Sequence, residues 1–265
     1  PDGAKVADNI HNSAPDRSVI IGNHAGSYAN PGSAASSQWD FRTNEGTQVN
    51  GLSDPSGYPA GNINRRVTPN AMKPGKTAMG RGSWGAEAGN AMALASPLNL
   101  AVDAYYRPGT STIEIIVEGY YTSAGNGSDY LTVAILQDNI LSYQSGSSGY
   151  PARVDPSTGL YRQMDVLRAY ATTSVLGDEI STTDAGTFFI KNYSYAVAKV
   201  GPDITPVLDD MKVAVWMTEE MTWSEVITVA ALGGGAGGHV GARAVGINEA
   251  TSLEGLQIYP NPFAT

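Results

Sequence analysis

From residue 98 onward the sequence consists of short segments rich in Val, Ile, Thr and Tyr, separated by clusters of turn residues. Apolar and polar residues alternate in 212–218, which indicates a strand with one buried face. Several short strands joined by such turns are typical of an antiparallel β-sandwich, which we predict over residues 98–232. The expected strands are Leu98–Tyr106, Thr112–Tyr121, Tyr130–Asp138, Thr187–Ala198, Met211–Thr218 and Glu225–Ala231. Between them, Tyr161–Thr172 is expected to be a helix or a corner.

Residues 1–97 have a different pattern, in which helical and strand-like segments alternate. Val6 and Ile10 are spaced as on one face of a helix, and the apolar run in Arg17–His24 is typical of a central strand buried on both faces. The expected order is a helix over 2–14, a strand over 17–24, a helix over 41–52 with Asp40 as its N-cap, a strand over 57–64 and a helix over 77–95. This order predicts a small α/β domain, so the chain as a whole belongs to the α+β class with two domains.

The tail over residues 233–265 begins with a glycine-rich linker, Gly233–Gly238, which is flexible by composition. Its end, Tyr259-Pro-Asn-Pro262, resembles the start of the C-terminal sorting domain of cargo of the type IX secretion system, which implies an extracellular or outer-membrane location. The strand-like part of the tail could add to the sheet edge of a neighbouring copy, and such a contact forms a fibre if it does not close. The residues of this candidate assembly tail are Leu253, Leu256, Ile258, Tyr259, Pro260, Asn261, Pro262 and Phe263.

Composition excludes several classes of function. The net charge is −9, and this argues against nucleic acid as a partner, because phosphate binding needs a basic surface. No window contains enough consecutive apolar residues for a membrane helix. Cysteine is absent, so the chain as given has no disulfide, reactive thiol or cysteine-ligated metal. It starts at Pro1 rather than Met, from which we expect processing or a longer precursor.

Four segments resemble the Omp28-related outer-membrane protein family: residues 1–8, Tyr58–Asn64, Val133–Ile140 and Asp165–Arg168. The resemblance implies a thioredoxin-like N-terminal domain over 1–97, followed by a β-rich domain. It also implies a cis peptide bond before Pro59, at the position where thioredoxin-like folds place a cis-proline. A Cys-x-x-Cys motif of such a fold would lie upstream of Pro1, and the residues given contain none.

The best polar cluster that the sequence offers is His24 with Asp16, Asp40 and Tyr58. Because no nucleophile lies beside it, we interpret His24 as a hydrogen-bonded structural histidine. The three histidines are scattered and do not form a metal site. We therefore expect no catalytic, cofactor-binding or metal-binding residues and no enzymatic activity.

The sequence leaves three hypotheses about function. The first is an extracellular structural protein that assembles with copies of itself, or with other surface proteins, into a filament or array. The second is a thioredoxin-like thiol oxidoreductase whose cysteines precede Pro1. The third is a carbohydrate-binding surface protein, because the strands carry Tyr105, Tyr106, Tyr120, Tyr121, Tyr193 and Tyr195. Adjacent tyrosines point to opposite faces of a sheet, so core packing explains many of them more simply than a glycan site.

Overall fold

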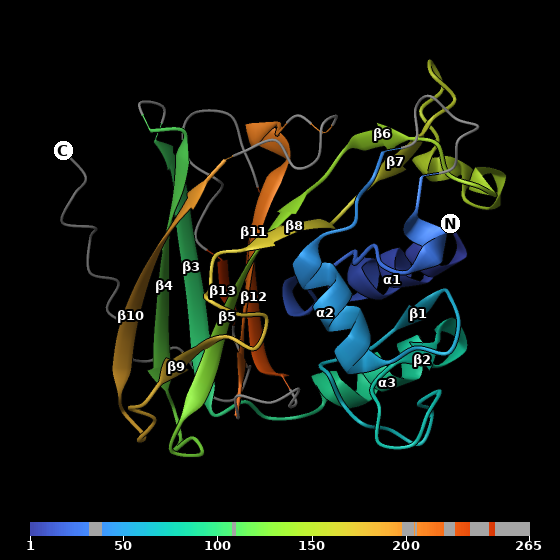
Figure 1. The fold of residues 1–265 in the computed structure, drawn as a ribbon. Helices are drawn as coiled ribbons and strands as arrows, with labels where there is room; N and C mark the ends of the chain where they lie inside the picture. The colour runs from blue at the N-terminus through green and yellow to red at the C-terminus, as the bar shows by residue number, and fades with distance from the viewer. Residues whose placement is uncertain are drawn as a thin grey trace.

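The computed structural model describes residues 1–31, 39–107, 110–197, 204, 206–219, 226–233 and 244–246. In these ranges two mostly antiparallel sheets are stacked, and the α-helices lie on one side of the stack (Figure 1). This mixture of helices and antiparallel strands agrees with the predicted α+β class. The helices are α1 (Asp2–Ser13), α2 (Asn44–Ser53) and α3 (Trp84–Met92).

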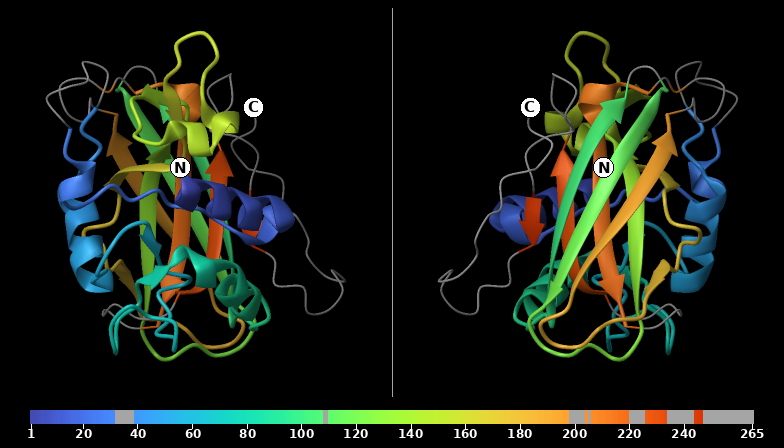
Figure 2. Two further views of the ribbon diagram at one scale, coloured as in Figure 1. Left: turned by 90° about the vertical axis from the view of Figure 1, so that its right-hand side faces the viewer. Right: turned by 90° about the vertical axis from the view of Figure 1, so that its left-hand side faces the viewer.

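The first sheet has four strands in the order β10-β4-β3-β13. Strand β10 pairs with β4 along its whole length, and β13 lies at the opposite edge, as the right panel of Figure 2 shows. The bounds are β3 (Leu98–Arg107), β4 (Thr112–Tyr121), β10 (Phe188–Ala196) and β13 (Ala244–Gly246).

The second sheet has five strands in the order β12-β11-β5-β8, with β9 also paired to β5. Its bounds are β5 (Asp129–Gln137), β8 (Val166–Tyr170), β9 (Asp178–Ile180), β11 (Met211–Thr218) and β12 (Val226–Gly233). Two small two-stranded sheets complete the strands: β1 (Ala60–Gly61) with β2 (Met79–Gly80), and β6 (Ile140–Ser142) with β7 (Tyr161–Gln163).

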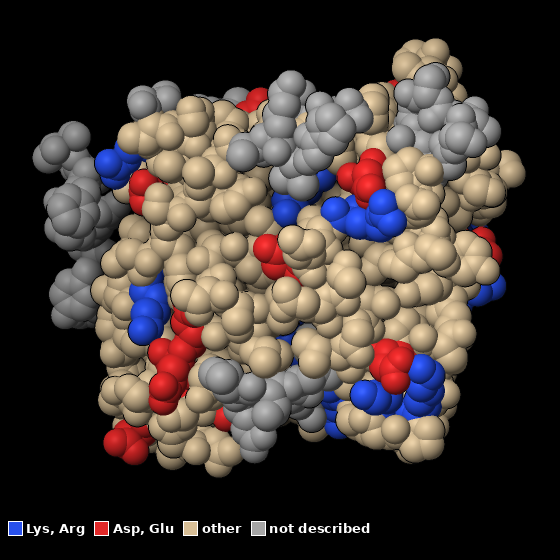
Figure 3. Space-filling model, viewed as in Figure 1, with Lys and Arg blue, Asp and Glu red and all other residues tan. Residues whose placement is uncertain are grey.

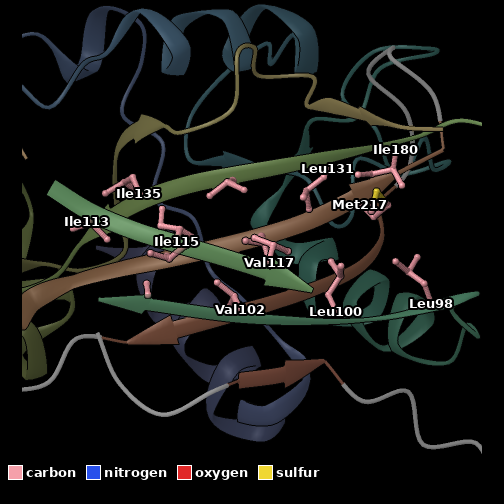
Figure 4. Close-up of a cluster of buried hydrophobic side chains, with 14 of the residues drawn as sticks. Leu98, Leu100, Val102, Ile113, Ile115, Val117, Leu131, Ile135, Ile180 and Met217 are labelled. Atoms are coloured by element: carbon pink, nitrogen blue, oxygen red, sulfur yellow. The ribbon is translucent and has the colours of Figure 1, made fainter. Parts of the chain in front are cut away.

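The main hydrophobic core fills the space between the two sheets (Figure 4). On β4 the residues Ile113, Ile115 and Val117 are buried, while the residues between them are half-buried on the outer face. This alternation is the pattern of a strand with one face in a core. The tyrosines follow the same rule, because Tyr121 belongs to the core and its neighbour Tyr120 is exposed.

Strands β5 and β11 are buried almost continuously because the second sheet is covered on both faces. Its inner face meets the sandwich core. Its outer face carries a second core that includes Leu136, Leu167 and Trp216, against which Val19 and Ile21 of the N-terminal region pack. The left panel of Figure 2 shows α1 crossing in front of this sheet. The molecule is therefore built in three layers.

All six strands predicted after residue 97 are present, to within three residues at each end. The helix or corner over Tyr161–Thr172 is wrong: this segment forms β7 and β8. Asp165 between them has a left-handed backbone with φ of 56°, and its backbone N–H and carboxylate are held by Asp138 and Lys212. These long-range contacts decide the local structure and are not visible in the pattern of the segment.

The N-terminal elements are shorter than predicted. The strand over Arg17–His24 is reduced to one parallel bridge, between Gly22 and Val166, and it is half-buried rather than buried on both faces. Only Ala60–Gly61 of the strand over 57–64 pairs, and the helix over 77–95 begins at Trp84 because Met79–Gly80 pairs with β1. A thioredoxin-like sheet is thus not formed within the described part of residues 1–97, and the two-domain arrangement stays a prediction.

The tail contributes β13, which pairs with β3 of its own sheet, so this part is not only a linker. The candidate assembly residues Leu253, Leu256, Ile258, Tyr259 and 260–263 lie outside the described residues.

Helix α2 is capped by Thr43 and not by Asp40, which instead binds Arg42. The Thr43 hydroxyl oxygen accepts a hydrogen bond of 2.9 Å from the backbone N–H of Gly46. We expect Thr43→Ala to lower the free energy of unfolding by about 1 kcal/mol, because an N–H at the start of the helix loses its partner. Urea denaturation measures this change. Thr47→Ala, inside the same helix, is the control and should have little effect; equal losses in both variants would contradict the capping role.

Candidate functional site

A cavity of about 490 Å³ lies between the helical layer and the outer face of the five-stranded sheet. Its walls come from α1, α2, two extended segments over 19–24 and 58–65, and strands β7, β8, β11 and β12. The volume is within the range of sites for small molecules and cofactors. This cavity is the candidate functional site.

Helix α1 presents small and apolar residues to the cavity, namely Gly3, Ala4, Ala7 and Ile10, which recur on one face. Gly3 lies in the first turn, where a Cβ atom would be 2.9 Å from the Cβ of Pro59. Glycine is thus required for the close approach of α1 to the 58–65 segment.

The segment over 19–24 forms one border of the cavity. The Gly22 N–H donates to the carbonyl of Asp165 (2.7 Å), and the Gly22 carbonyl accepts from the N–H of Leu167 (3.0 Å). Because backbone groups alternate along an extended chain, those of Ile21 and Asn23 point away from β8. Among the described residues they make no backbone–backbone hydrogen bond.

Strand β1 forms a second border of the cavity. Within the described ranges, Ala60 and Gly61 pair with β2 and with no other strand. The peptide bond between Tyr58 and Pro59, just before the strand, is cis. A Cβ atom on Gly61 would be 2.8 Å from the indole of Trp84, so the strand lies directly on that ring.

The acidic residues of the cavity wall are held in ion pairs. The Arg153 guanidinium donates to the Asp8 carboxylate (Nε to Oδ2, 2.9 Å), which also accepts from the Tyr150 hydroxyl (2.7 Å). The Lys212 ammonium binds Asp138 at 2.6 Å and Asp165 at 2.8 Å. Burial lowers the pKa of Lys212, but the attraction of Asp165 and the hydrogen bonds to both carboxylates outweigh this effect, and its pKa is raised. Both acidic residues of the wall, Asp8 and Asp165, are therefore bound to cations.

Arg65 lies in the cavity wall near the aromatic residues. Its guanidinium stacks over the Trp216 ring at 5.3 Å and donates to the carbonyl of Val175. Burial lowers the pKa of Arg65 to about 10, so it remains a cation at neutral pH. Burial also raises the pKa of Tyr161, a cavity residue, to about 12.

The predicted polar cluster around His24 is not assembled. In the described structure the His24 ring packs against the Phe41 ring (4.9 Å between centroids), its Nδ1 atom has no hydrogen-bond partner, and no hydrogen bond, ion pair or ring contact joins it to Asp16, Asp40 or Tyr58. Burial lowers the pKa of His24, which favours the neutral ring. His24 and Tyr58 both line the cavity, whereas Asp16 and Asp40 do not.

The described residues contain no group of three His, Asp or Glu side chains that could hold a metal ion. Within the same ranges, no helix has the length and apolar content needed to cross a membrane.

Comparison with known proteins supports the resemblance found in the sequence. The profile of the outer membrane protein Omp28 family matches residues 47–229. The chain belongs to the Omp28 family. No curated protein matches it.

Two solved structures are similar to the chain. One is a domain of the outer membrane lipoprotein Omp28 from Porphyromonas gingivalis, with 17% identity, coverage of 51% of this chain and 86% of that chain, and a TM-score of 0.33. The other is β-glucosidase 3B from Thermotoga neapolitana in complex with glucose, with 9% identity, coverage of 57% and 17%, and a TM-score of 0.25. Both TM-scores are below 0.5.

Sequence reasoning missed most of the cavity wall in this Omp28-family chain. Asp8 and Arg153 are 145 residues apart, and Lys212 and Asp165 are 47 apart. No local pattern connects such pairs. One usable signal of the cavity is the apolar run Val19–Ile21. Its sequence fits a central strand buried on both faces, but the run is only half-buried and lines the cavity.

Proposed function

We propose that the protein is a non-enzymatic outer-membrane surface protein whose copies associate through the β10 edge of the four-stranded sheet. Membership of an outer-membrane protein family supports the location. Export by a type IX route is part of the proposal and rests on the Tyr259–Pro262 motif.

The observation that carries the proposal is the open edge of β10. The strand is nine residues long, contains no proline and pairs with β4 without a bulge, while its other side is not paired with any described strand. A long flat edge of this kind presents unpaired backbone groups to a further strand. Phe188 and Ile190 on its outer row are 54% and 51% exposed, and Tyr120 lies beside Phe188, so an apolar patch adjoins the edge.

The tail of a neighbouring copy is the partner strand that we propose. Its first part, β13, already adds to this sheet at the edge opposite β10. A donor at one edge and an acceptor at the other give a head-to-tail contact, and head-to-tail contacts that do not close give filaments. Lys191 lies on the inner row of β10. An inward-pointing charge on an edge strand hinders pairing with arbitrary strands, so it favours pairing with one specific partner strand over unlimited edge-to-edge aggregation.

The surface composition is compatible with such contacts. On the face in Figure 3, acidic and basic residues form small groups separated by broad uncharged areas. A contact made over an uncharged area places few charges of the same sign opposite one another, although each copy carries a net charge of −9.

Sedimentation velocity and electron microscopy of the purified chain test the proposal. We expect particles larger than the 27.7 kDa monomer, and at least tenfold weaker association for Ile190→Lys, because the lysine ammonium is placed in the contact. Val207→Lys is the matched control, since Val207 is 46% exposed and lies outside the sheet. A chain that remains monomeric at every concentration would refute self-association, and equal association of both variants would refute the β10 contact.

A further inference from the structure

The outer face of the four-stranded sheet lies on the far side of the stack from the helices and the N-terminus (Figure 1). Tyr105 of β3 and Tyr120 of β4 occupy outward positions on this face, and Tyr120 is exposed. The other tyrosines considered above for a glycan site belong to the sandwich core or pack against it, namely Tyr106, Tyr121, Tyr193 and Tyr195. The structure thus separates the tyrosines that a ligand can reach from those that build the core.

The strand register places Tyr120 in one row with two other outward side chains. Tyr120 pairs with Phe188 of β10 on one side and with Asn99 of β3 on the other. Phe188 is exposed as well, and side chains of directly paired residues lie close enough to interact. The two rings therefore form one aromatic platform with an amide group beside it.

Polar side chains continue this face along the strands. Ile116, four residues before Tyr120 on β4, pairs with Asn192 of β10 and with Asp103 of β3. Because strand residues are spaced by about 3.3 Å, this row lies ~13 Å from the aromatic row. Within the described structure no hydrogen bond occupies the side chains of Asn99, Asp103 or Asn192. Their amide and carboxylate groups are available as donors and acceptors.

The mixture of groups on this face disfavours a protein partner that covers it. Stable protein–protein contacts bury about 800 Å² on each partner and have an apolar centre. Here Asn99, Asp103 and Asn192 interrupt the apolar side chains, and such a contact would bury them without partners. A sugar ring has apolar C–H faces between hydroxyl groups that donate and accept hydrogen bonds. Its surface therefore alternates in the same way as this face.

We propose that the outer face of the four-stranded sheet binds a neutral glycan of β-linked pyranose rings with equatorial hydroxyl groups. Equatorial hydroxyls leave the C–H faces of a ring open, so one ring stacks on Tyr120 and Phe188. Hydroxyl groups of the glycan bind Asn99, Asp103 and Asn192. The carboxylate of Asp103 and the net charge of −9 disfavour an anionic polysaccharide. A strand added to the β10 edge would widen this face without covering it, so the site does not depend on self-association.

Isothermal titration of the intact chain with cellohexaose, laminarihexaose and hexa-N-acetylchitohexaose tests the proposal. These probes are uncharged and consist of β-linked pyranose rings with equatorial hydroxyls. We expect saturable binding of at least one of them. A hexamer of β-1,4-linked glucuronate, which adds one carboxylate to each ring, should bind at least about tenfold more weakly than the best neutral probe. The absence of saturable binding of all three neutral probes, or tighter binding of the glucuronate hexamer, would overturn the proposal.

Variants of the protein locate the site. Tyr120→Ala removes a ring of the platform and should weaken binding at least about tenfold, and Asn99→Ala removes an amide and should weaken it at least about threefold. Tyr143→Ala, which removes an exposed tyrosine outside the strands, is the matched control and should bind normally. Unchanged affinity in Tyr120→Ala and Asn99→Ala would overturn the assignment, as would an equal loss in Tyr143→Ala. Because β4 separates Asn99 from β10, Asn99→Ala should leave the association of copies unchanged, which separates this test from that of the β10 edge.

Discussion

Replacing Trp216 by alanine is expected to lower the free energy of unfolding by about 3–5 kcal/mol. The Trp216 side chain is only 5% exposed and lies on the outer face of the five-stranded sheet, under the N-terminal layer. Its ring meets Tyr170 edge-on at 5.9 Å and carries the Arg65 guanidinium. Alanine removes the ring between the layers and leaves Arg65 buried without its aromatic partner.

Urea denaturation of wild type and variant measures the loss. Trp216→Phe is the control: it keeps an aromatic ring and removes an indole N–H that has no hydrogen-bond partner in the described structure, so its effect should be clearly smaller. If the N-terminal region were a separate domain that did not cover this sheet, Trp216 would be exposed and Trp216→Ala would have almost no effect. A loss below about 1 kcal/mol would therefore contradict the three-layer fold.

Replacing Lys212 by methionine is expected to lower the free energy of unfolding by about 3–5 kcal/mol at neutral pH. The ammonium is the cation that binds both Asp138 and Asp165, and these side chains are 11% and 15% exposed. Without it, two poorly solvated carboxylates face each other. Attraction between the ions is thus replaced by repulsion at a site where water cannot compensate.

The loss from Lys212→Met should depend on pH. Burial raises the pKa of Asp165 even with Lys212 present. Because the Lys212 ammonium lowers this pKa, removing the ammonium raises the pKa of Asp165 further. An acid whose pKa is higher in the folded than in the unfolded state favours folding when protonated, so its contribution is present below the unfolded pKa and is lost as pH rises through the folded pKa. The deficit should therefore be larger at pH 8 than at about pH 5.

Two further variants serve as controls for Lys212→Met. Lys212→Met with Asp165→Asn should recover part of the stability at high pH, because one of the two facing carboxylates is gone. Lys191→Met on β10 removes a lysine elsewhere and should show no comparable pH dependence. A deficit for Lys212→Met that is the same at both pH values would mean that the carboxylates do not carry the effect.

The sandwich could be predicted from the sequence because each strand carries its own signal. On β4 the buried Ile113, Ile115 and Val117 are β-branched and alternate with residues on the outer face, so periodicity and turn residues are sufficient. The segment over 161–172 could not be predicted in this way. Its division into β7 and β8 depends on Asp165, whose backbone is fixed by Asp138 from another part of the chain.

The residues of the candidate site could be predicted less well from the sequence. The prediction of His24 with Asp16, Asp40 and Tyr58 assumed a thioredoxin-like arrangement, but Asp40 is held by its neighbour Arg42. The cavity walls instead come from segments separated by more than a hundred residues, as with Asp8 and Arg153. Only the three-dimensional arrangement brings these groups together.

Because the five-stranded sheet is buried on both faces, it links the unfolding of the sandwich to that of the helical layer. Strands β5 and β11 contribute side chains to the sandwich core on one face and to the second core on the other face. If these strands separate from either core, the other core is therefore also exposed to water. We therefore expect their amide protons to exchange only through global unfolding, while those of β10 and α3 exchange through local openings at the periphery. Sandwich and helical layer should then melt in one transition. This cooperativity would protect the fold from proteases that attack partly opened chains.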